Sequence, residues 1–299
     1  MRYAGELASL LTAFCWSTNS VLFSLAGQRV GSPTVNITRL AWALLAMVLL
    51  HVLVLGSPFP VGAEPWRFGW LGISGLIGFA LGDAVLFEAF VRLGPRLAML
   101  IMTLWPVFAT VLAWAFLGER LSAGRLASMG AALGGIAWVV ADKASKADGV
   151  SRKHLAGGVL LALGGAVGQA TGFLFSRFGL EGGFHPISAN LVRVSAGILA
   201  LSLWMALRRE LVPNFAKLKD RKAALMIAIG AAAGPVTGVV LSLYAQTRAP
   251  QGVAATLMSL SPVILLPVSA WLYKEKITWR AVGGTALTLA GVAGLFLAA

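Results

Sequence analysis

Long apolar stretches separated by short polar breaks dominate the pattern of the chain. Each stretch is long enough to cross the hydrocarbon core of a bilayer, which takes about 20 helical residues. Breaks at glycine, proline and charged clusters divide the chain into ten such stretches. They cover residues 5–27, 33–55, 66–92, 95–117, 121–141, 154–179, 185–208, 221–248, 250–273 and 277–297. The pattern predicts an all-α integral membrane protein with ten transmembrane helices.

The composition supports this prediction. Hydrophobic residues make up 58% of the 299 residues and charged residues only 12%, whereas about a quarter of a soluble domain is charged. The formal net charge is +13, but the basic residues cluster in loops between apolar stretches, which is typical of membrane orientation signals. We therefore expect a lipid bilayer around the chain and no nucleic-acid partner. The longest connections, 142–154 and 208–222, leave no room for a soluble catalytic domain.

The chain also matches itself. Residues 80–107 align with residues 237–263, and glycine, arginine, proline and glutamate recur at nearly one offset. The matched pairs are Gly82 with Gly238, Arg92 with Arg248, Pro106 with Pro262 and Glu119 with Glu275. Such matches indicate an internal repeat rather than a chance likeness between apolar helices.

The repeat sets the expected architecture. Each half holds five helices, and because five is odd, consecutive halves must face opposite ways across the membrane. We expect a first repeat at 1–141, a cytoplasmic linker at 142–153 and a second repeat at 154–299. Inverted repeats around a central cavity are typical of secondary transporters, which bind substrate near the middle of the bilayer.

The basic residues predict the orientation. Loops after the odd-numbered stretches hold 16 Lys and Arg, and the opposite side holds 6. The positive-inside rule places the richer side in the cytoplasm. We therefore expect a multi-pass protein of the bacterial inner membrane with both termini in the periplasm, and we interpret the first apolar stretch as a retained helix.

A family resemblance follows from how each half ends. Each closes with an apolar helix, an acid and a glycine-rich last helix, as in FLGERL (116–121) and LYKEKI (272–277). This arrangement resembles the ten-helix EamA-type members of the drug/metabolite transporter superfamily over nearly the whole chain. CWSTNSVLFS (15–24) and LGDAVLFEAF (81–90) look most like bacterial aromatic amino-acid exporters. The resemblance implies export of amino acids or similar metabolites, although relatives also carry sugars, nucleotide sugars and organic cations.

Polar and aromatic residues inside the apolar stretches are the candidates for a substrate site, since such groups generally face a bundle interior or a water-filled cavity. The candidate substrate-binding residues are Trp16, Asn19, Asp83, Thr103, Trp105, Gln169, Tyr244, Gln246 and Ser259. For each Ser or Thr the alternative is helix packing, and Trp105 could either stack on a ligand or pack. Helix breaks are expected at Pro106, Pro235 and Pro262, and the glycine pairs at 134–135, 164–165 and 283–284 predict close helix contacts.

The charged residues inside the stretches divide into two groups. Arg39 and Arg193 each follow an Asn by three residues in matched positions, which favours a structural role over capture of a substrate carboxylate. Glu88 and Arg92 are four residues apart, and we expect a local ion pair. Asp83 has no partner on its own helix. It either pairs with Arg39 or faces the cavity, where it could bind a substrate ammonium group or a coupling proton.

Other classes of function are disfavoured. The single cysteine, Cys15, and three widely separated histidines form no metal-binding pattern, and we expect no metal, cofactor or enzymatic activity. No phosphate-loop motif is present, so ATP hydrolysis by this chain is not expected. The sequence predicts a monomeric secondary transporter that exports amino acids, with aromatic ones as candidates, or related small metabolites by alternating access. The alternatives are a multidrug or organic-cation carrier, a nucleotide-sugar carrier, a channel and an intramembrane enzyme.

Overall fold

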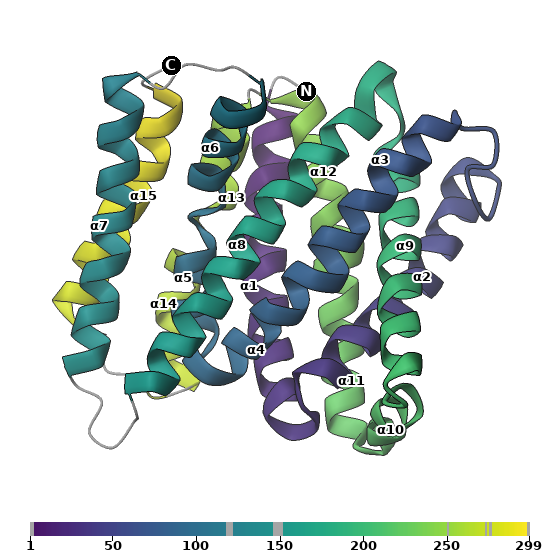
Figure 1. Cartoon of the computed structure of the whole chain (residues 1–299), viewed down its shortest axis with the longest axis horizontal. Coiled ribbons are helices and arrows are strands. Elements are labelled where there is room, and N and C mark those ends of the chain that lie inside the picture. The colour runs from purple at the N-terminus through teal and green to yellow at the C-terminus, as the bar shows by residue number, and fades with distance from the viewer. Residues whose placement is uncertain are drawn as a thin grey trace.

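A computed structural model describes residues 3–117, 122–145, 152–249, 251–272, 274 and 277–297 of the chain. Within these ranges the chain is helical and contains no strand. The helices run up and down in one bundle, and α1 begins and α15 ends at the same edge (Figure 1). An even number of crossings accounts for that arrangement.

The first half contains α1 (Ala4–Val30), α2 (Ser32–Leu55), a third span made of α3 (Pro65–Gly75), η1 (Leu76–Gly82) and α4 (Asp83–Leu93), a fourth span made of α5 (Pro95–Met102) and α6 (Trp105–Leu117), and α7 (Ala123–Ser145). The second half contains α8 (Arg152–Leu180), α9 (Pro186–Leu207), a span made of α11 (Arg221–Ala231), η4 (Ala232–Gly238) and α12 (Val239–Arg248), a span made of α13 (Gln251–Met258) and α14 (Ser261–Leu272), and α15 (Trp279–Leu297). The short elements η2 (Glu181–Gly183), α10 (Leu211–Ala216) and η3 (Lys217–Lys219) lie in the connections around α9.

The predicted membrane fold is confirmed. Among the described residues, nine helical spans are long and apolar enough to cross a bilayer, and α15 follows them as a helix of 19 residues. The two halves repeat the same order of five spans, including an interrupted third and an interrupted fourth span. Each predicted stretch coincides with one of these spans to within a few residues.

The third span of each half widens into a π-helix near its middle. Both π-helical segments, η1 and η4, are seven residues long and end at the matched glycines, Gly82 and Gly238. Pro235 lies inside η4, where it removes one backbone donor. A Cβ at Gly82 would lie 3.2 Å from the Gly168 Cα, so these two glycines let the third span approach α8 closely.

The fourth span of each half is broken just before its proline. α5 ends at Met102 and α6 begins at Trp105, so that Pro106 is the second residue of α6. In the second half, Pro262 is likewise the second residue of α14. Proline is favoured in a first helical turn because its missing N–H has no intrahelical acceptor there. The two prolines therefore start new helices.

The loop before α11 is fixed by an aspartate. Asp220 caps α11 by accepting hydrogen bonds from the backbone N–H groups of Lys222 and Ala223, both at 3.1 Å. Arg29, at the end of α1, donates to the other carboxylate oxygen at 2.8 Å. This hydrogen bond, with the cap, lowers the pKa of Asp220. The contact ties the first helix to the second half on the edge opposite the termini.

Helices α7 and α15 pack on each other at one edge of the bundle (Figure 1). Their backbones approach closely because both carry glycines at the contact. A Cβ at Gly135 would lie 2.6 Å from the carbonyl oxygen of Gly284. The neighbouring Gly134 points elsewhere, and a Cβ there would meet no atom within 4 Å among the described residues.

This difference allows a matched test of the α7–α15 contact. Gly135→Val is expected to lower the melting temperature of the purified protein, since forcing extra volume into a packed contact costs about 1–3 kcal/mol. Gly134→Val adds the same atoms to the same helix where there is space, and it should leave the melting temperature nearly unchanged. Equal melting temperatures for the two variants would contradict the close packing of α7 on α15.

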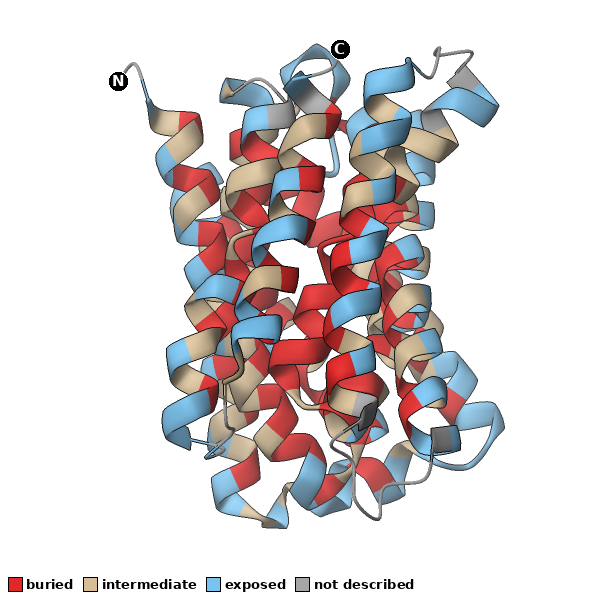
Figure 2. Cartoon of the chain, turned by 90° about the vertical axis from the view of Figure 1, so that its left-hand side faces the viewer, coloured by how far each residue is buried: buried red, intermediate tan, exposed pale blue. Residues whose placement is uncertain are grey.

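Burial follows the bundle axis. Buried positions concentrate along the middle of the bundle, and exposed positions face outward (Figure 2). The outward positions include large apolar side chains such as Leu45, Leu53, Leu203 and Trp204. An apolar outer surface of this extent fits contact with lipid rather than water, so polar groups inside the bundle are the place to look for a binding site.

Candidate functional site

A cavity lies between the two halves. The empty space in it, including the part open to solvent, is about 760 Å³. Its lining residues come from both halves, but none of those described comes from α3, α7 or α15. The α7–α15 pair therefore lies outside the site, and the other eight spans contribute to its lining.

Seven of the 22 lining residues are aromatic. The aromatic lining residues are Trp16, Phe23, Phe79, Phe87, Phe90, Trp105 and Phe173. Phe173 lies between the two tryptophans, with ring centroids 6.4 Å from Trp16 and 5.0 Å from Trp105. On the other side Phe23 lies 5.1 Å from Phe87. These ring faces suit an apolar or aromatic ligand.

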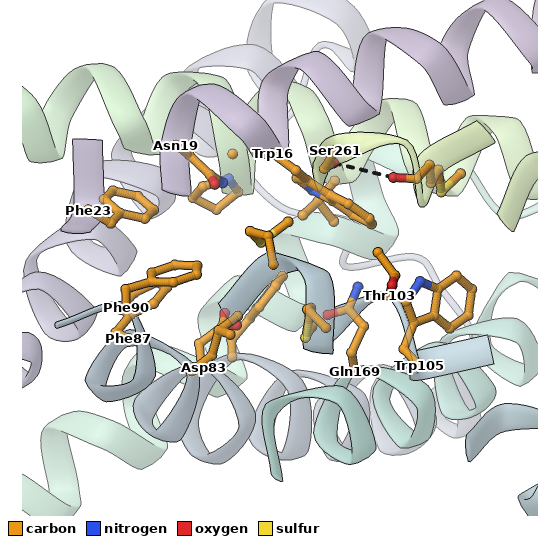
Figure 3. A pocket seen from close by; sticks show the side chains of 18 of the residues that line it. Trp16, Asn19, Phe23, Asp83, Phe87, Phe90, Thr103, Trp105, Gln169 and Ser261 are labelled. Atoms are coloured by element: carbon orange, nitrogen blue, oxygen red, sulfur yellow. Dashed lines mark hydrogen bonds between the residues drawn. The ribbon is translucent and has the colours of Figure 1, made fainter. Parts of the chain in front are cut away.

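Two amides face each other across the space. In Figure 3, Asn19 projects from α1 on the wall that also carries Trp16. Gln169 projects from α8 on the opposite wall, on the same side as Asp83. Neither amide has a hydrogen-bond partner among the described residues. A Cβ at Gly234 would overlap the Asn19 amide, so glycine is needed there for Asn19 to occupy its place. The two amides are thus free donors and acceptors for a ligand.

The hydroxyl groups at the helix breaks are already used. Thr103 donates to the Leu100 carbonyl at 2.6 Å, and Ser259 donates to the Ala255 carbonyl at 2.8 Å. Ser261 lies near the Ala13 carbonyl, at 3.1 Å. These bonds satisfy carbonyl groups at and beside the interrupted turns. Thr103 and Ser259 line the cavity, but their hydroxyl protons are engaged with the backbone.

Asp83 pairs with Arg39 in the cavity wall. The Arg39 Nη2 donates to the Asp83 Oδ2 at 2.6 Å, and the side chains are 3% and 15% exposed for Arg39 and Asp83. Arg39 also donates to the Asn36 Oδ1 at 2.9 Å and to the Phe79 carbonyl at 3.1 Å, and it lies 4.7 Å from the centroid of the Phe87 ring. Asp83 is therefore paired with Arg39 and also lines the cavity.

One oxygen of Asp83 is left over. The Oδ2 atom accepts from Arg39, and no described residue donates to Oδ1. An anionic carboxylate with a free oxygen can accept a hydrogen bond from an ammonium group, or it can take up a proton. The site therefore has one acceptor with negative charge beside the two amides.

Arg193 also lines the cavity. The sequence interpretation placed it in the scaffold with Arg39, but the structure holds the two side chains differently. Arg39 and Arg193 lie 5.6 and 4.7 Å from the centroid of the Phe79 ring, so both surround one aromatic side chain. Two arginines and one aspartate leave the cavity with a net positive charge.

Two candidate substrate-binding residues lie outside the cavity lining, and so does Glu88, which was expected to form a local ion pair. Glu88 accepts from Arg92 at 2.8 Å and from Ser32 at 2.6 Å, which is the local ion pair expected near the end of α4. Tyr244 and Gln246 do not line the cavity. They follow Val239, which does, by five and seven residues along α12, or about 8 and 10 Å at the rise of a helix. The Gln246 amide donates to the Ser242 carbonyl at 3.4 Å.

The phenylalanines are the functional residues that sequence reasoning missed. Phe79 and Phe87 lie four residues before and after Asp83, so a helical pattern places all three on one face. The prediction considered only whether Asp83 has a partner on its own helix, and neither phenylalanine was among the candidate site residues. The signal that could have found them is the aromatic character of that face, which suits an arginine guanidinium as well as a ligand.

The described residues contain no group of three or more His, Cys, Asp or Glu that could hold a metal ion. The cavity lining likewise lacks a nucleophile paired with a histidine. The described lining offers aromatic surfaces, free amides and charged groups, all of which can contact a ligand.

Comparison with known proteins agrees with a ligand-binding cavity in a membrane bundle. The profile of the EamA-like transporter family matches residues 3–141 and 156–297. The match to one solved crystal structure covers 100% of this chain and 98% of the other chain, with a TM-score of 0.61 and 21% sequence identity. At that identity the likeness shows the fold alone. A comparison with curated proteins gave no match.

Proposed function

The chain belongs to the EamA-like transporter family, and we propose that it exports amino acids, aromatic ones among them, or related small metabolites as a secondary transporter. The observation that carries the proposal is the aromatic-walled cavity between the two halves. Asp83 offers a free carboxylate oxygen there, and Asn19 and Gln169 offer free amides. An amino acid with an apolar side chain has groups that match each of these features.

The proposed mechanism is alternating access. Substrate binds between the halves and leaves on the other side when groups of helices rock around the site. The interrupted spans support this mechanism, because η1, η4 and the breaks before Pro106 and Pro262 all adjoin the cavity. Such irregular turns allow one part of a helix to move relative to the other.

The proposed orientation rests on the distribution of basic residues. We place the edge that carries the most lysine and arginine in the cytoplasm of a bacterium, with both termini in the periplasm. Export then moves the substrate from the basic edge toward the edge that holds the ends of α1 and α15 (Figure 1). Proton exchange and facilitated diffusion are the two candidate driving forces, and uptake measured with and without a pH gradient separates them.

An organic-cation or multidrug carrier is the alternative within the same superfamily, and a nucleotide-sugar carrier is another. The aromatic wall and the acid suit an organic cation as well as an amino acid. The second arginine counts against it, since a net positive cavity repels a ligand that carries only positive charge. Competition between these compounds for uptake separates the alternatives.

The proposal predicts uptake of tritiated L-phenylalanine by proteoliposomes that contain the purified protein. We expect uptake to saturate with concentration and to exceed that of empty liposomes, because a carrier has a finite number of sites. The assay is run with and without a pH gradient, and unlabelled amino acids, organic cations and nucleotide sugars are added as competitors. Uptake no greater than in empty liposomes for every labelled amino acid tested would refute amino-acid transport, and flux without saturation would indicate a channel.

A further inference from the structure

The side chain of Arg193 is a buried cation that makes no hydrogen bond to a described residue. The residue is 2% exposed, and its Nε and Nη1 atoms are buried and have no hydrogen-bond partner among the described residues. It nevertheless lines the cavity between the halves. The carboxylate of Asp83 interacts electrostatically with this guanidinium, but buried donors without acceptors are still costly to a protein, so this position needs an explanation.

The matched arginine of the first half, Arg39, does have hydrogen-bond partners. Arg39 donates to Asn36, to the Phe79 carbonyl and to Asp83. The corresponding asparagine of the second half, Asn190, donates to the Pro235 carbonyl at 2.7 Å. Its side-chain oxygen has no partner among the described residues. The asparagine–arginine contact of the first half is therefore not made in the second.

The sequence explains part of this difference. The repeat alignment places Val239 opposite Asp83, so that the second half keeps the arginine and lacks the acid. A residue kept only for the scaffold would be expected to keep its partner as well. The second half instead presents a guanidinium whose hydrogen-bonding capacity is unused.

The surroundings hold Arg193 in place without using its N–H groups. The rings of Phe79 and Phe173 lie 4.7 and 5.9 Å from its guanidinium carbon, and such contacts orient a guanidinium through its face. Gly75 makes room for this part of α9, since a Cβ at Gly75 would collide with the Arg193 backbone. The side chain is thus positioned, desolvated and unsatisfied.

We propose that Arg193 binds the carboxylate of the transported substrate. A guanidinium presents its donors in a planar fork that matches a carboxylate and can form two parallel hydrogen bonds. The substrate class is then an organic acid with one carboxylate and an apolar or aromatic body, which the cavity wall would hold. The inference rests on the proposed function in one respect, namely that this cavity is the substrate site.

The test uses three ligands that differ only in their charged groups. These are 3-phenylpropanoate, which has the carboxylate alone, 2-phenylethylamine, which has the ammonium group alone, and L-phenylalanine, which has both. Equilibrium binding of tritiated 3-phenylpropanoate to the purified full-length protein is measured, with the other two as competitors. We expect the wild-type protein to bind the carboxylate, L-phenylalanine to compete and the amine to compete poorly.

The second part of the test measures the same binding in variants of Arg193. Arg193→Met should weaken binding of 3-phenylpropanoate by about tenfold or more, which is the usual effect of removing a charged hydrogen bond. Arg193→Lys keeps the positive charge but lacks the planar pair of donors, so its affinity for 3-phenylpropanoate should lie between those of the wild type and Arg193→Met. Arg208→Met, at an exposed arginine that packs on Trp204, is the matched control and should bind as the wild type does.

A stability measurement separates binding from a scaffold role. Because Arg193 lacks hydrogen bonds, the ligand-free Arg193→Met protein should melt no lower than the wild type. Unchanged carboxylate binding in Arg193→Met would overturn the inference, as would binding of the amine but of neither acid by the wild type. Loss of folded protein in both Arg193 variants would also overturn it by assigning the residue to the scaffold.

These outcomes are distinct from failure of the proposed function. If wild-type proteoliposomes transport L-phenylalanine and Arg193→Met binds acids normally, the inference fails and the function stands. If Arg193 is required for binding but no ligand crosses the membrane, transport of these compounds fails and the carboxylate site stands.

Discussion

Asp83→Asn is expected to reduce transport of L-phenylalanine by about tenfold or more. The substitution removes the only acid of the described cavity lining, and with it the negative charge of the ion pair to Arg39 and one of the two acceptor oxygens. Hydrogen bonds to charged groups contribute about 1.5–3 kcal/mol, which corresponds to about 10- to 150-fold. Initial rates in proteoliposomes measure the effect, and purified protein of normal melting behaviour is required for the comparison.

The pH dependence of the same variant tests proton coupling. If Asp83 exchanges a proton during the cycle, the wild-type rate should vary with pH and the Asp83→Asn rate should not. Glu88→Gln is the matched control, because it removes an acid of the same helix that lies outside the cavity lining. Full transport by Asp83→Asn with an unchanged pH profile would exclude proton coupling through this residue.

Arg39→Met should destabilise the protein more than Gly135→Val does. It removes every hydrogen bond that Arg39 makes to Asn36, Phe79 and Asp83, and it leaves the carboxylate without its partner. Breaking a buried ion pair from one side costs about 3–5 kcal/mol. The Asp83 side chain is 15% exposed, so we expect the lower end of that range. Thermal unfolding of the purified protein measures the change.

A double substitution shows whether the uncompensated charge causes the loss. Arg39→Met combined with Asp83→Leu replaces both charges by apolar groups, and much of the stability should return, since buried ion pairs can often be replaced in this way. Arg208→Met controls for loss of a cation in general. If the double variant is no more stable than Arg39→Met alone, the carboxylate is not the source of the instability.

The sequence left two alternatives for Asp83, namely an ion pair with Arg39 or a position facing the cavity. Both residues enter the membrane from the same side and reach similar depth, and helix geometry alone establishes that. Sequence could not show that Asp83 pairs with Arg39 and faces the cavity at once, because that depends on how α2 and α4 pack against each other.

The spans were predictable for a simple reason. In lipid, each crossing segment must be apolar over a fixed length, so the pattern of hydrophobic positions encodes the helices directly. The sequence also located the helix breaks near the matched prolines of the fourth and ninth spans. It did not predict η1, because no proline or other strong breaker marks that π-helical turn.

The errors in placement have a related cause. A π-helical turn holds more residues than an α-helical turn, and every residue after it is rotated relative to a regular helix. Tyr244 and Gln246 follow η4 and were chosen only because they are polar, so neither this rotation nor their distance of about 8 and 10 Å from Val239 entered the prediction. The unused hydrogen-bonding groups of Arg193 were also beyond the sequence, since the absence of a partner among the described residues is a property of packing in three dimensions.

The paired π-helical turns also bear on the history of the molecule. Segments of the same length at aligned positions, each ending in glycine, indicate that the widened turn existed before an ancestral five-helix unit was duplicated. The acid is not shared by the two repeats, because one carries Asp83 where the other has Val239. The duplicated framework thus supplied the shape of the chamber, and divergence of the copies supplied its unequal charges.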